Sequence, residues 1–279
     1  MRFGICNEMF EGWTIEDVFR HAAEAGYQGV EVAPFTLASS VRDVSPAQRT
    51  RIRDAAARAG VAIIGLHWLL VSPKDLYVTH PDAAVRKRTQ EYFIDLVNFA
   101  ADLGADRMIF GSPKQRNVMD GVTFEQAWAW ARDLLRGIAS VAERRGVTIC
   151  IEPLAPSETN FINTALDAIR LAKEVDSPRV KIILDAKAMS SEATPIPDII
   201  RRSGSWVAHV HANDPNLRGP GFGELDFRPI ASALRDIGYR GWVSVEVFDF
   251  TIDPNETAAK SIAYLREAFR ANEPTQTRR

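Results

Sequence analysis

The chain has 279 residues, and its 34 Lys and Arg stand against 36 Asp and Glu, which gives a formal net charge of −2. No stretch concentrates basic residues, which argues against nucleic acid or another general polyanion as a partner. Hydrophobic residues make up 46% of the chain. They are numerous enough for a sizeable core, but no run approaches the ~20 apolar residues of a membrane span. We therefore expect neither nucleic acid nor membrane as a partner.

The length suits one α/β barrel, which needs roughly 250 residues, or two smaller domains. Cys6 and Cys150 both fall inside predicted strands, and their spacing matches no zinc or redox motif. We expect them to be buried free thiols in a reducing compartment. The chain enters a strand directly after Met1, which leaves no room for a signal peptide. A cytoplasmic location is the default expectation.

Short apolar, β-branched runs alternate with amphipathic helical segments along the whole chain. Thr14 is the expected N-cap of the first helix and Gly26 its left-handed cap, while Ser45 followed by Pro46 opens the second helix. The predicted strands are 3–7, 30–32, 61–66, 107–110, 149–152, 181–185, 207–211 and 242–246. The predicted helices are 14–26, 45–60, 82–103, 123–145, 163–175, 197–202, 228–237 and 255–269.

These segments form eight strand-then-helix units with no change of composition between them. The strands are mostly apolar, as in a parallel sheet that is covered on both faces. A doubly wound open sheet is the alternative, but it would place a glycine-rich phosphate turn after the first strand, and residues 7–12 form no such turn. The sequence predicts a single (β/α)8 TIM barrel over residues 1–272, followed by a polar tail over residues 273–279.

Four of the predicted strands end in a residue that can bind a metal. Glu152, Asp185, His211 and Glu246 follow one another at intervals of 33, 26 and 35 residues, each the length of one strand, one helix and their loops. The carboxyl ends of parallel barrel strands meet on one face, where active sites lie. A single carboxylate at a strand end is often a cap or a loop tether. Four such residues at matching positions favour one shared metal site.

Three carboxylates and one imidazole make a hard, oxygen-rich site. Such a site suits Mn²⁺, with Mg²⁺ or Co²⁺ as alternatives, whereas a structural zinc would favour thiolates. His209 points to the same side of its strand as His211, because side chains alternate with a period of two. We interpret His209 as a substrate-side or second-layer group. A hydrogen-bonded core histidine is the alternative.

The second half of the chain also carries motifs of a known family. The chain resembles the xylose-isomerase-like sugar phosphate isomerase/epimerase superfamily, and within it the ketose 3-epimerase (D-tagatose/D-allulose 3-epimerase) branch. The motifs are Ile151-Glu152-Pro153-Leu154 with Glu158, Leu184-Asp185, His209-Val210-His211 with Asp214, Arg218 before Pro220-Gly221-Phe222-Gly223, and Ser244-Val245-Glu246.

The resemblance implies that Glu152, Asp185, His211 and Glu246 bind a divalent metal, which chelates the carbonyl oxygen and a neighbouring hydroxyl of an open-chain sugar. It also implies that Glu152 and Glu246 form the acid/base pair of an epimerase or isomerase. A hydrogen next to a carbonyl is a weak acid, and chelation stabilises the developing enediolate. Glu158 and Arg218 would hold substrate hydroxyls, and the protein would be a homo-oligomer, either a dimer or a tetramer.

The sequence departs from the family pattern at two places. The branch usually has a histidine three residues after the aspartate ligand, but Ala188 stands there beside Lys187. We interpret Lys187 as the replacement, and a surface lysine is the alternative. The loop after the fourth strand carries Lys114 and Arg116, two cations that an acidic sugar group could contact. Tethering of the loop is the alternative role for them.

His67 and Trp68 follow the third strand and Trp13 follows the first, so they are candidates for an apolar wall beside a sugar ring, or for ordinary packing. The departures favour a modified keto-sugar, such as a 3-oxo-glycoside, an inosose or a sugar acid. A lyase or dehydratase that β-eliminates from such a sugar through the same enediolate is therefore the main rival. A multinuclear zinc nuclease would need several more histidines and a basic groove, and it is disfavoured because the chain has only five His and a net charge of −2. An inactive barrel is disfavoured by the four intact ligands.

Overall fold

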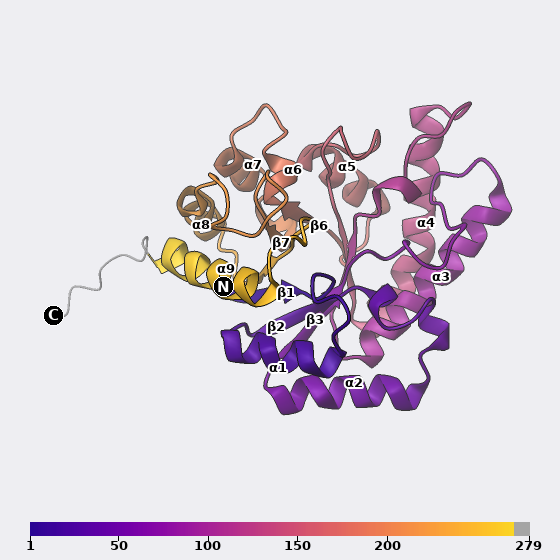
Figure 1. The fold of residues 1–279 in the computed structure, drawn as a ribbon. Helices are drawn as coiled ribbons and strands as arrows, with labels where there is room; N and C mark the ends of the chain where they lie inside the picture. Colours follow the sequence, from indigo (N-terminus) through magenta and orange to yellow (C-terminus); the bar gives the residue numbers. More distant parts are fainter. Residues whose placement is uncertain (271–279) are drawn as a thin grey trace.

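The computed structural model describes residues 1–270, so the predicted tail at 273–279 lies outside the described residues. Eight parallel strands follow one another around a closed barrel, and β8 pairs with β1 to complete it (Figure 1). The predicted single TIM barrel is confirmed. The strands are β1 (Arg2–Cys6), β2 (Gly29–Val32), β3 (Ala62–Leu66), β4 (Arg107–Phe110), β5 (Thr148–Ile151), β6 (Val180–Asp185), β7 (Val207–Ala212) and β8 (Trp242–Val245).

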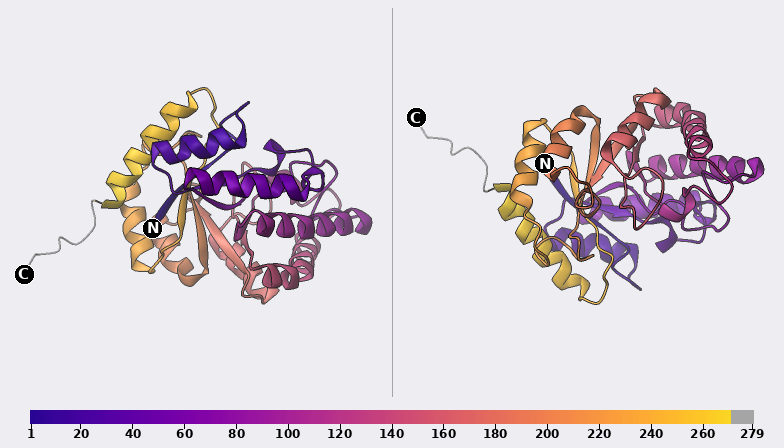
Figure 2. Two further views of the ribbon diagram at one scale, coloured as in Figure 1. Left: turned by 90° about the horizontal axis from the view of Figure 1, so that it is seen from below. Right: turned by 90° about the horizontal axis from the view of Figure 1, so that it is seen from above.

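A helix follows every strand and packs outside the barrel, as the views from below and above show (Figure 2). The helices are α1 (Ile15–Ala25), α2 (Pro46–Ala59), α3 (Ala83–Asp102), α4 (Phe124–Arg145), α5 (Ala165–Val175), α7 (Ile196–Ser203), α8 (Phe227–Asp236) and α9 (Pro254–Arg270). One further short helix, α6 (Ala186–Met189), was not predicted. It begins immediately after β6, with the side chain of Asp185 accepting a hydrogen bond from the backbone of Ala188.

The helix boundaries follow the capping signals in the sequence. The side chain of Thr14 accepts a hydrogen bond from the backbone N–H of Asp17, and Gly26 ends α1 with a left-handed φ of 95°. Ser45 and Gln48 form a complete capping box at the start of α2. The predicted caps are therefore confirmed. Residues of this kind occur at helix starts because their side chains satisfy backbone donors that the first helical turn leaves without partners.

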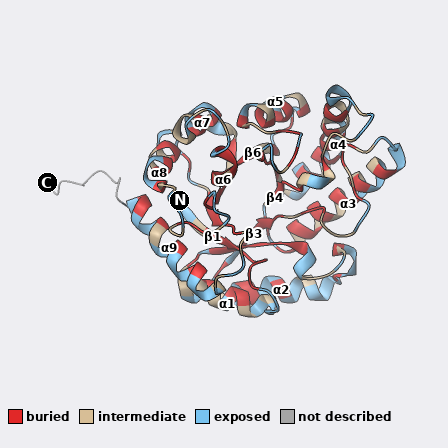
Figure 3. Ribbon diagram, turned by 45° about the horizontal axis from the view of Figure 1, so that its top comes forward, coloured by how far each residue is buried: buried red, intermediate tan, exposed pale blue. Residues whose placement is uncertain are grey.

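Burial separates the strands from the outer helices. Figure 3 shows buried strands inside a ring of helices whose outer faces are exposed. Cys6 and Cys150 are buried free thiols, as predicted, and burial raises the pKa of each to about 12. Among residues 1–270, no helix combines the length and the apolar character needed to cross a membrane.

Helix α4 carries two tryptophans, Trp128 and Trp130. Trp128 is buried within the chain, where its ring contacts Phe161 and its Nε1 donates to Glu174 at 2.8 Å. Trp130 is partly covered by the guanidinium of Arg86, 4.1 Å from the ring centre. Trp128 therefore packs inside its own chain and is not available for an interface between subunits.

Candidate metal centre and substrate pocket

The four predicted metal ligands meet at the carboxyl ends of their strands. Glu152 follows β5, Asp185 ends β6, His211 lies near the end of β7 and Glu246 follows β8. One ligand atom from each lies within 4.8 Å of all the others. His211 Nδ1 is 3.4 Å from Glu152 Oε1, 3.9 Å from Asp185 Oδ2 and 3.0 Å from Glu246 Oε2. Residues up to 94 positions apart are thereby brought to one point.

The barrel backbone fixes these positions. Asp185 and His211 are register partners on β6 and β7. The backbone N–H of Glu152 donates to the carbonyl of Phe110, and that of Glu246 donates to the carbonyl of Ala212, so both glutamates continue the strand ladders. Gly111 leaves the room that the Glu152 carboxylate occupies, because a Cβ at this position would overlap Glu152 Oε2.

Three carboxylates at one buried point repel one another. Burial raises the pKa of Asp185 to about 7, and the neighbouring charges of Glu152 and Glu246 add to that effect. Asn213 Nδ2 donates to Asp185 Oδ2 at 2.6 Å, which holds the carboxylate in place. A divalent cation bound between the three carboxylates would offset this repulsion, because each carboxylate would be attracted to the cation.

Glu31, on β2, organises the histidines of the barrel interior. It is fully buried, and its carboxylate contacts His209 Nε2 at 2.7 Å and His211 Nε2 at 3.0 Å. Burial alone would raise the pKa of Glu31, but His209 and His211 outweigh burial and hold the pKa well below its usual range. Glu31 is therefore ionised and can only accept, so each histidine carries a proton on Nε2.

This arrangement fits a metal ligand. With Nε2 of His211 bound to Glu31, Nδ1 is directed toward the three carboxylates and has no hydrogen-bond partner among the described residues. A histidine that binds a metal through one ring nitrogen usually donates the N–H of its other ring nitrogen to a carboxylate or another acceptor, which fixes the orientation of the ring. The four side chains therefore provide three oxygen donors and one nitrogen donor for a divalent ion.

Metal affinity is predicted to depend on pH. Asp185, with its pKa of about 7, must lose its proton before it can bind a cation. His211 must lose one too: burial lowers its pKa, but Glu246 and Glu31 outweigh burial and raise it well above the usual range. Below these pKa values protons compete with the metal. We expect the affinity for Mn²⁺ to fall about tenfold or more from pH 8 to pH 6.

Calorimetric titration of Mn²⁺ in two buffers with different heats of ionisation checks this prediction. Proton release on binding should appear as a difference in heat between the buffers, and it should be larger at pH 6 than at pH 8. An affinity that is the same at both pH values would contradict the electrostatic description of the site.

On one side of the cluster, Lys187 and Glu158 form an ion pair. Lys187 Nζ lies 2.6 Å from Glu158 Oε1 and 4.3 Å from the centre of the Phe248 ring, and the lysine side chain is only 10% exposed. Burial opposes the charge of Lys187, but Asp185 and Glu158 outweigh burial and raise its pKa. The structure thus places Lys187 as an ammonium group beside the pocket, and the surface alternative is wrong.

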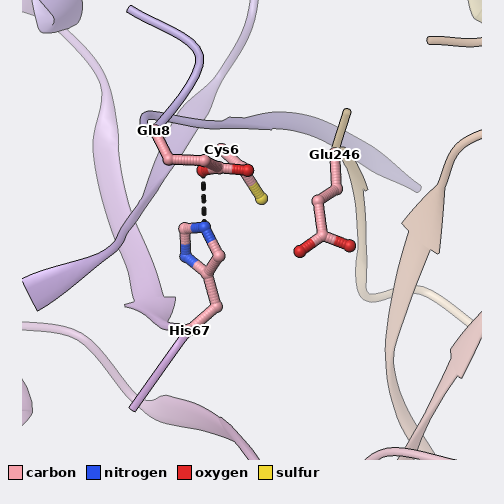
Figure 4. A group of neighbouring side chains, drawn as sticks. All are labelled: Cys6, Glu8, His67 and Glu246. Atoms are coloured by element: carbon pink, nitrogen blue, oxygen red, sulfur yellow. Dashed lines mark hydrogen bonds and ion pairs between the residues drawn. The ribbon is translucent and has the colours of Figure 1, made fainter. Parts of the chain in front are cut away.

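On the other side, Glu8 and His67 form a second buried pair (Figure 4). His67 Nε2 lies 2.6 Å from Glu8 Oε2, and both residues are at most 5% exposed. Burial opposes the charge of His67, but Cys6 and Glu8 outweigh burial and raise its pKa well above the usual range. Glu246 lies close to both, so this pair borders the metal cluster. Trp68, the next residue after His67, lines the same pocket.

The two loop cations were candidates for contact with an acidic sugar group or for tethering the loop, and the structure gives them different surroundings. Arg116 is fully buried, and its guanidinium donates to the backbone carbonyls of Phe110 at 3.2 Å and Glu152 at 2.6 Å. A substrate-facing role for Arg116 is therefore wrong, because the side chain is used to tie the loop to β5. Lys114 is exposed and lies outside the residues that line the pocket.

Two further candidates lie away from the pocket. His209 is fully buried and bound to Glu31, which also binds His211, so it is a hydrogen-bonded core histidine one layer behind the metal cluster and does not line the pocket. Arg218 pairs with Asp249 at 2.8 Å, and its side chain is 41% exposed. A hydrogen bond from Thr251 and a second one from Arg218 lower the pKa of Asp249 to about 2. Neither His209 nor Arg218 is among the residues that line the pocket.

Sequence reasoning missed Glu31 and Glu8. Glu31 interrupts the apolar segment Gly29–Val32, and a charged residue in a strand that is covered on both faces must have a buried partner. That signal was available in the sequence. Glu8 gave a weaker signal, because it lies two residues beyond β1, in the loop after the strand.

The fold and the cluster define a TIM barrel with a candidate divalent-metal centre at the carboxyl ends of its strands. A family model described as a xylose isomerase-like TIM barrel matches residues 19–268. This chain belongs to that family.

Two curated relatives and one solved structure illustrate the similarity. The chain is 34% identical over 174 residues to a D-psicose 3-epimerase of Ruminiclostridium cellulolyticum, a match that covers 61% of this chain and 59% of the relative. It is 30% identical over 229 residues to a D-psicose 3-epimerase of Agrobacterium fabrum, covering 81% and 76%. A crystal structure of D-psicose 3-epimerase in the presence of D-fructose superposes with a TM-score of 0.86 at 26% identity, covering 96% of this chain and 99% of that one.

Proposed function

We propose that this protein is a divalent-metal-dependent epimerase, an isomerase-class enzyme that moves a proton at the carbon next to the carbonyl of a keto-sugar. The observation that carries the proposal is the meeting of Glu152, Asp185, His211 and Glu246 within 4.8 Å of one another. The relatives support the reaction class, because both are named D-psicose 3-epimerases.

The two glutamates have the positions that an acid/base pair needs. Glu152 and Glu246 follow β5 and β8, which are separated around the barrel by β6 and β7, and both line the pocket. We assign removal of the proton to one carboxylate and its return to the opposite face of the carbon to the other. A bound divalent ion, Mn²⁺ by preference and Mg²⁺ or Co²⁺ as alternatives, would act as a Lewis acid that stabilises charge on the substrate oxygen.

The proposal assigns substrate contacts to Glu158, Lys187, His67 and Trp68. Glu158, His67 and Trp68 line the pocket, and Lys187 is bound to Glu158. It does not extend to Lys114, Arg218 or His209, which lie outside the lining. The dimer or tetramer and the cytoplasmic location that the sequence suggests remain predictions.

Replacing Lys187 with methionine is expected to lower kcat/KM about 10²-fold, because a fixed cation that stabilises developing oxyanion charge is removed. Methionine has a similar length and apolar stem, so the contact with Phe248 is preserved. Steady-state kinetics and the amount of bound metal should be measured together. The matched control is Lys173→Met, because Lys173 lies near Trp206 and outside the pocket. Unchanged turnover in Lys187→Met would show that the lysine has no role in the reaction.

The reaction itself is tested by proton NMR of the metal-loaded protein in D₂O with a panel of keto-sugars. The panel holds free ketohexoses, 3-oxo-glucosides, inososes and their acidic counterparts. Deuterium at the carbon beside the carbonyl, together with a new epimer, is the expected result. A released leaving group with an unsaturated ketone would instead identify β-elimination. Absence of exchange in every sugar would contradict the proposal.

A further inference from the structure

A second and larger cavity adjoins the metal pocket. It has a volume of about 670 Å³, whereas the metal pocket encloses about 40 Å³. Trp68 and Phe248 are walls of both. The metal pocket alone has room for the reacting end of a sugar only, so a larger molecule bound there would have to extend past Trp68 and Phe248. The larger volume falls within the roughly 300–1,000 Å³ range of small-molecule sites.

The walls of the larger cavity are mainly apolar, and six of the lining residues are aromatic. Three of them, Trp13, Phe35 and Phe250, are 38%, 40% and 41% exposed. Trp68 joins them to the metal pocket, with its ring 6.4 Å from that of Phe35 and 6.2 Å from that of Phe248. Trp68 also has a φ of 53°, a conformation that is uncommon for a bulky residue and that is enriched at functional sites.

The junction between the cavities is polar. Glu8 lines the larger cavity, and its Oε2 is bound to His67 of the metal pocket (Figure 4). Glu8 Oε1 is buried and accepts no hydrogen bond from the described residues. Among the described lining residues, the charged side chains are Glu8 and Glu11, both acidic. A neutral hydroxyl fits the junction, and an anionic group is disfavoured in the cavity.

We propose that this aromatic cavity is the subsite for a neutral, apolar ring joined to the keto-sugar, so that the substrate class is that of aryl glycosides. The sugar end of this assignment rests on the proposed function. A flat apolar ring removes the exposed faces of Trp13, Phe35 and Phe250 from water and gains offset or edge-to-face contacts with them. The sugar lies at the junction, where a hydroxyl donates to Glu8 while the carbonyl end reaches the metal pocket.

The test compares binding of phenyl β-D-glucoside and methyl β-D-glucoside by calorimetry with the metal-loaded chain. Neither compound has the ketone, so binding is measured without turnover. We expect the phenyl compound to bind at least about tenfold more tightly. Phe35→Ala should abolish this preference. Phe124→Ala should retain it, because Phe124 has a similar exposure of 39% but packs on α4, away from the cavity.

Equal affinity for the two glucosides in the wild-type chain would overturn the proposal. It would also be overturned if Phe35→Ala kept the preference. A change in the mass in solution of that variant, measured by sedimentation, would then indicate that a second copy of the chain covers the cavity. Failure of the proposed function looks different. In that case the phenyl preference persists, while phenyl and methyl 3-oxo-glucosides both fail to exchange deuterium.

Discussion

Replacing Glu246 with glutamine is expected to lower kcat by about 10³-fold or more, because the amide cannot accept or return the proton that the carboxylate moves. The carboxylate lies 3.0 Å from His211 Nδ1, and Glu246 is only 5% exposed, so bulk water has little access with which to replace it as a base. Glutamine keeps one oxygen donor toward the metal. Turnover should be measured at saturating Mn²⁺, with bound metal quantified by atomic emission.

The metal measurement separates two reasons for lost activity. Metal-loaded but inactive Glu246→Gln supports the acid/base role, whereas a variant that keeps more than about a tenth of wild-type kcat contradicts it. Glu192→Gln is a matched control, because Glu192 is a partly buried glutamate that accepts from the backbone of Ala165, outside the metal cluster. Its turnover should stay near the wild-type value.

The second large effect is expected at Glu31. Glu31→Gln removes a fully buried negative charge that receives hydrogen bonds from His209 and His211. Breaking a buried charged network by removing one partner typically costs about 3–5 kcal/mol in the free energy of unfolding. Loss of the group that orients a histidine ligand typically weakens metal binding about 10–100-fold. Urea unfolding of the metal-free protein and calorimetric titration with Mn²⁺ measure the two effects separately.

His209→Asn is the informative comparison. His209 shares Glu31 with His211 but does not belong to the metal cluster. We expect this variant to lose stability while its affinity for Mn²⁺ changes much less than in Glu31→Gln. If Glu31→Gln binds Mn²⁺ as tightly as the wild-type chain, the support of His211 by Glu31 has no role in metal binding.

The barrel and the four strand-end ligands could be predicted because they depend on local signals. Most helices begin or end at a capping residue, as α1 does at Thr14 and Gly26. Each ligand, such as Asp185, comes at the end of an apolar run at a spacing of one strand and one helix. Once the strands are parallel and closed, their carboxyl ends must converge. No knowledge of individual contacts is needed.

The supporting contacts could not be predicted because they depend on three-dimensional pairing. Glu8 and His67 are 59 residues apart and come from loops after β1 and β3, so only the folded barrel shows that they bond to each other. Arg116 was a candidate either for substrate contact or for tethering the loop, and only the structure shows that its long side chain turns inward to three backbone carbonyls. The one-turn helix α6, which carries Lys187, is too short to give a periodic signal.

One measurement tests the central claim most directly. The protein is stripped of metal, Mn²⁺ is titrated back, and deuterium entry into the carbon beside the carbonyl of a responsive keto-sugar is followed by NMR in D₂O. We predict that the stripped protein exchanges no deuterium and that the rate rises linearly to a plateau at one Mn²⁺ per chain. Full exchange by the stripped protein would contradict the account. So would a plateau that Asp185→Asn and His211→Ala leave unchanged.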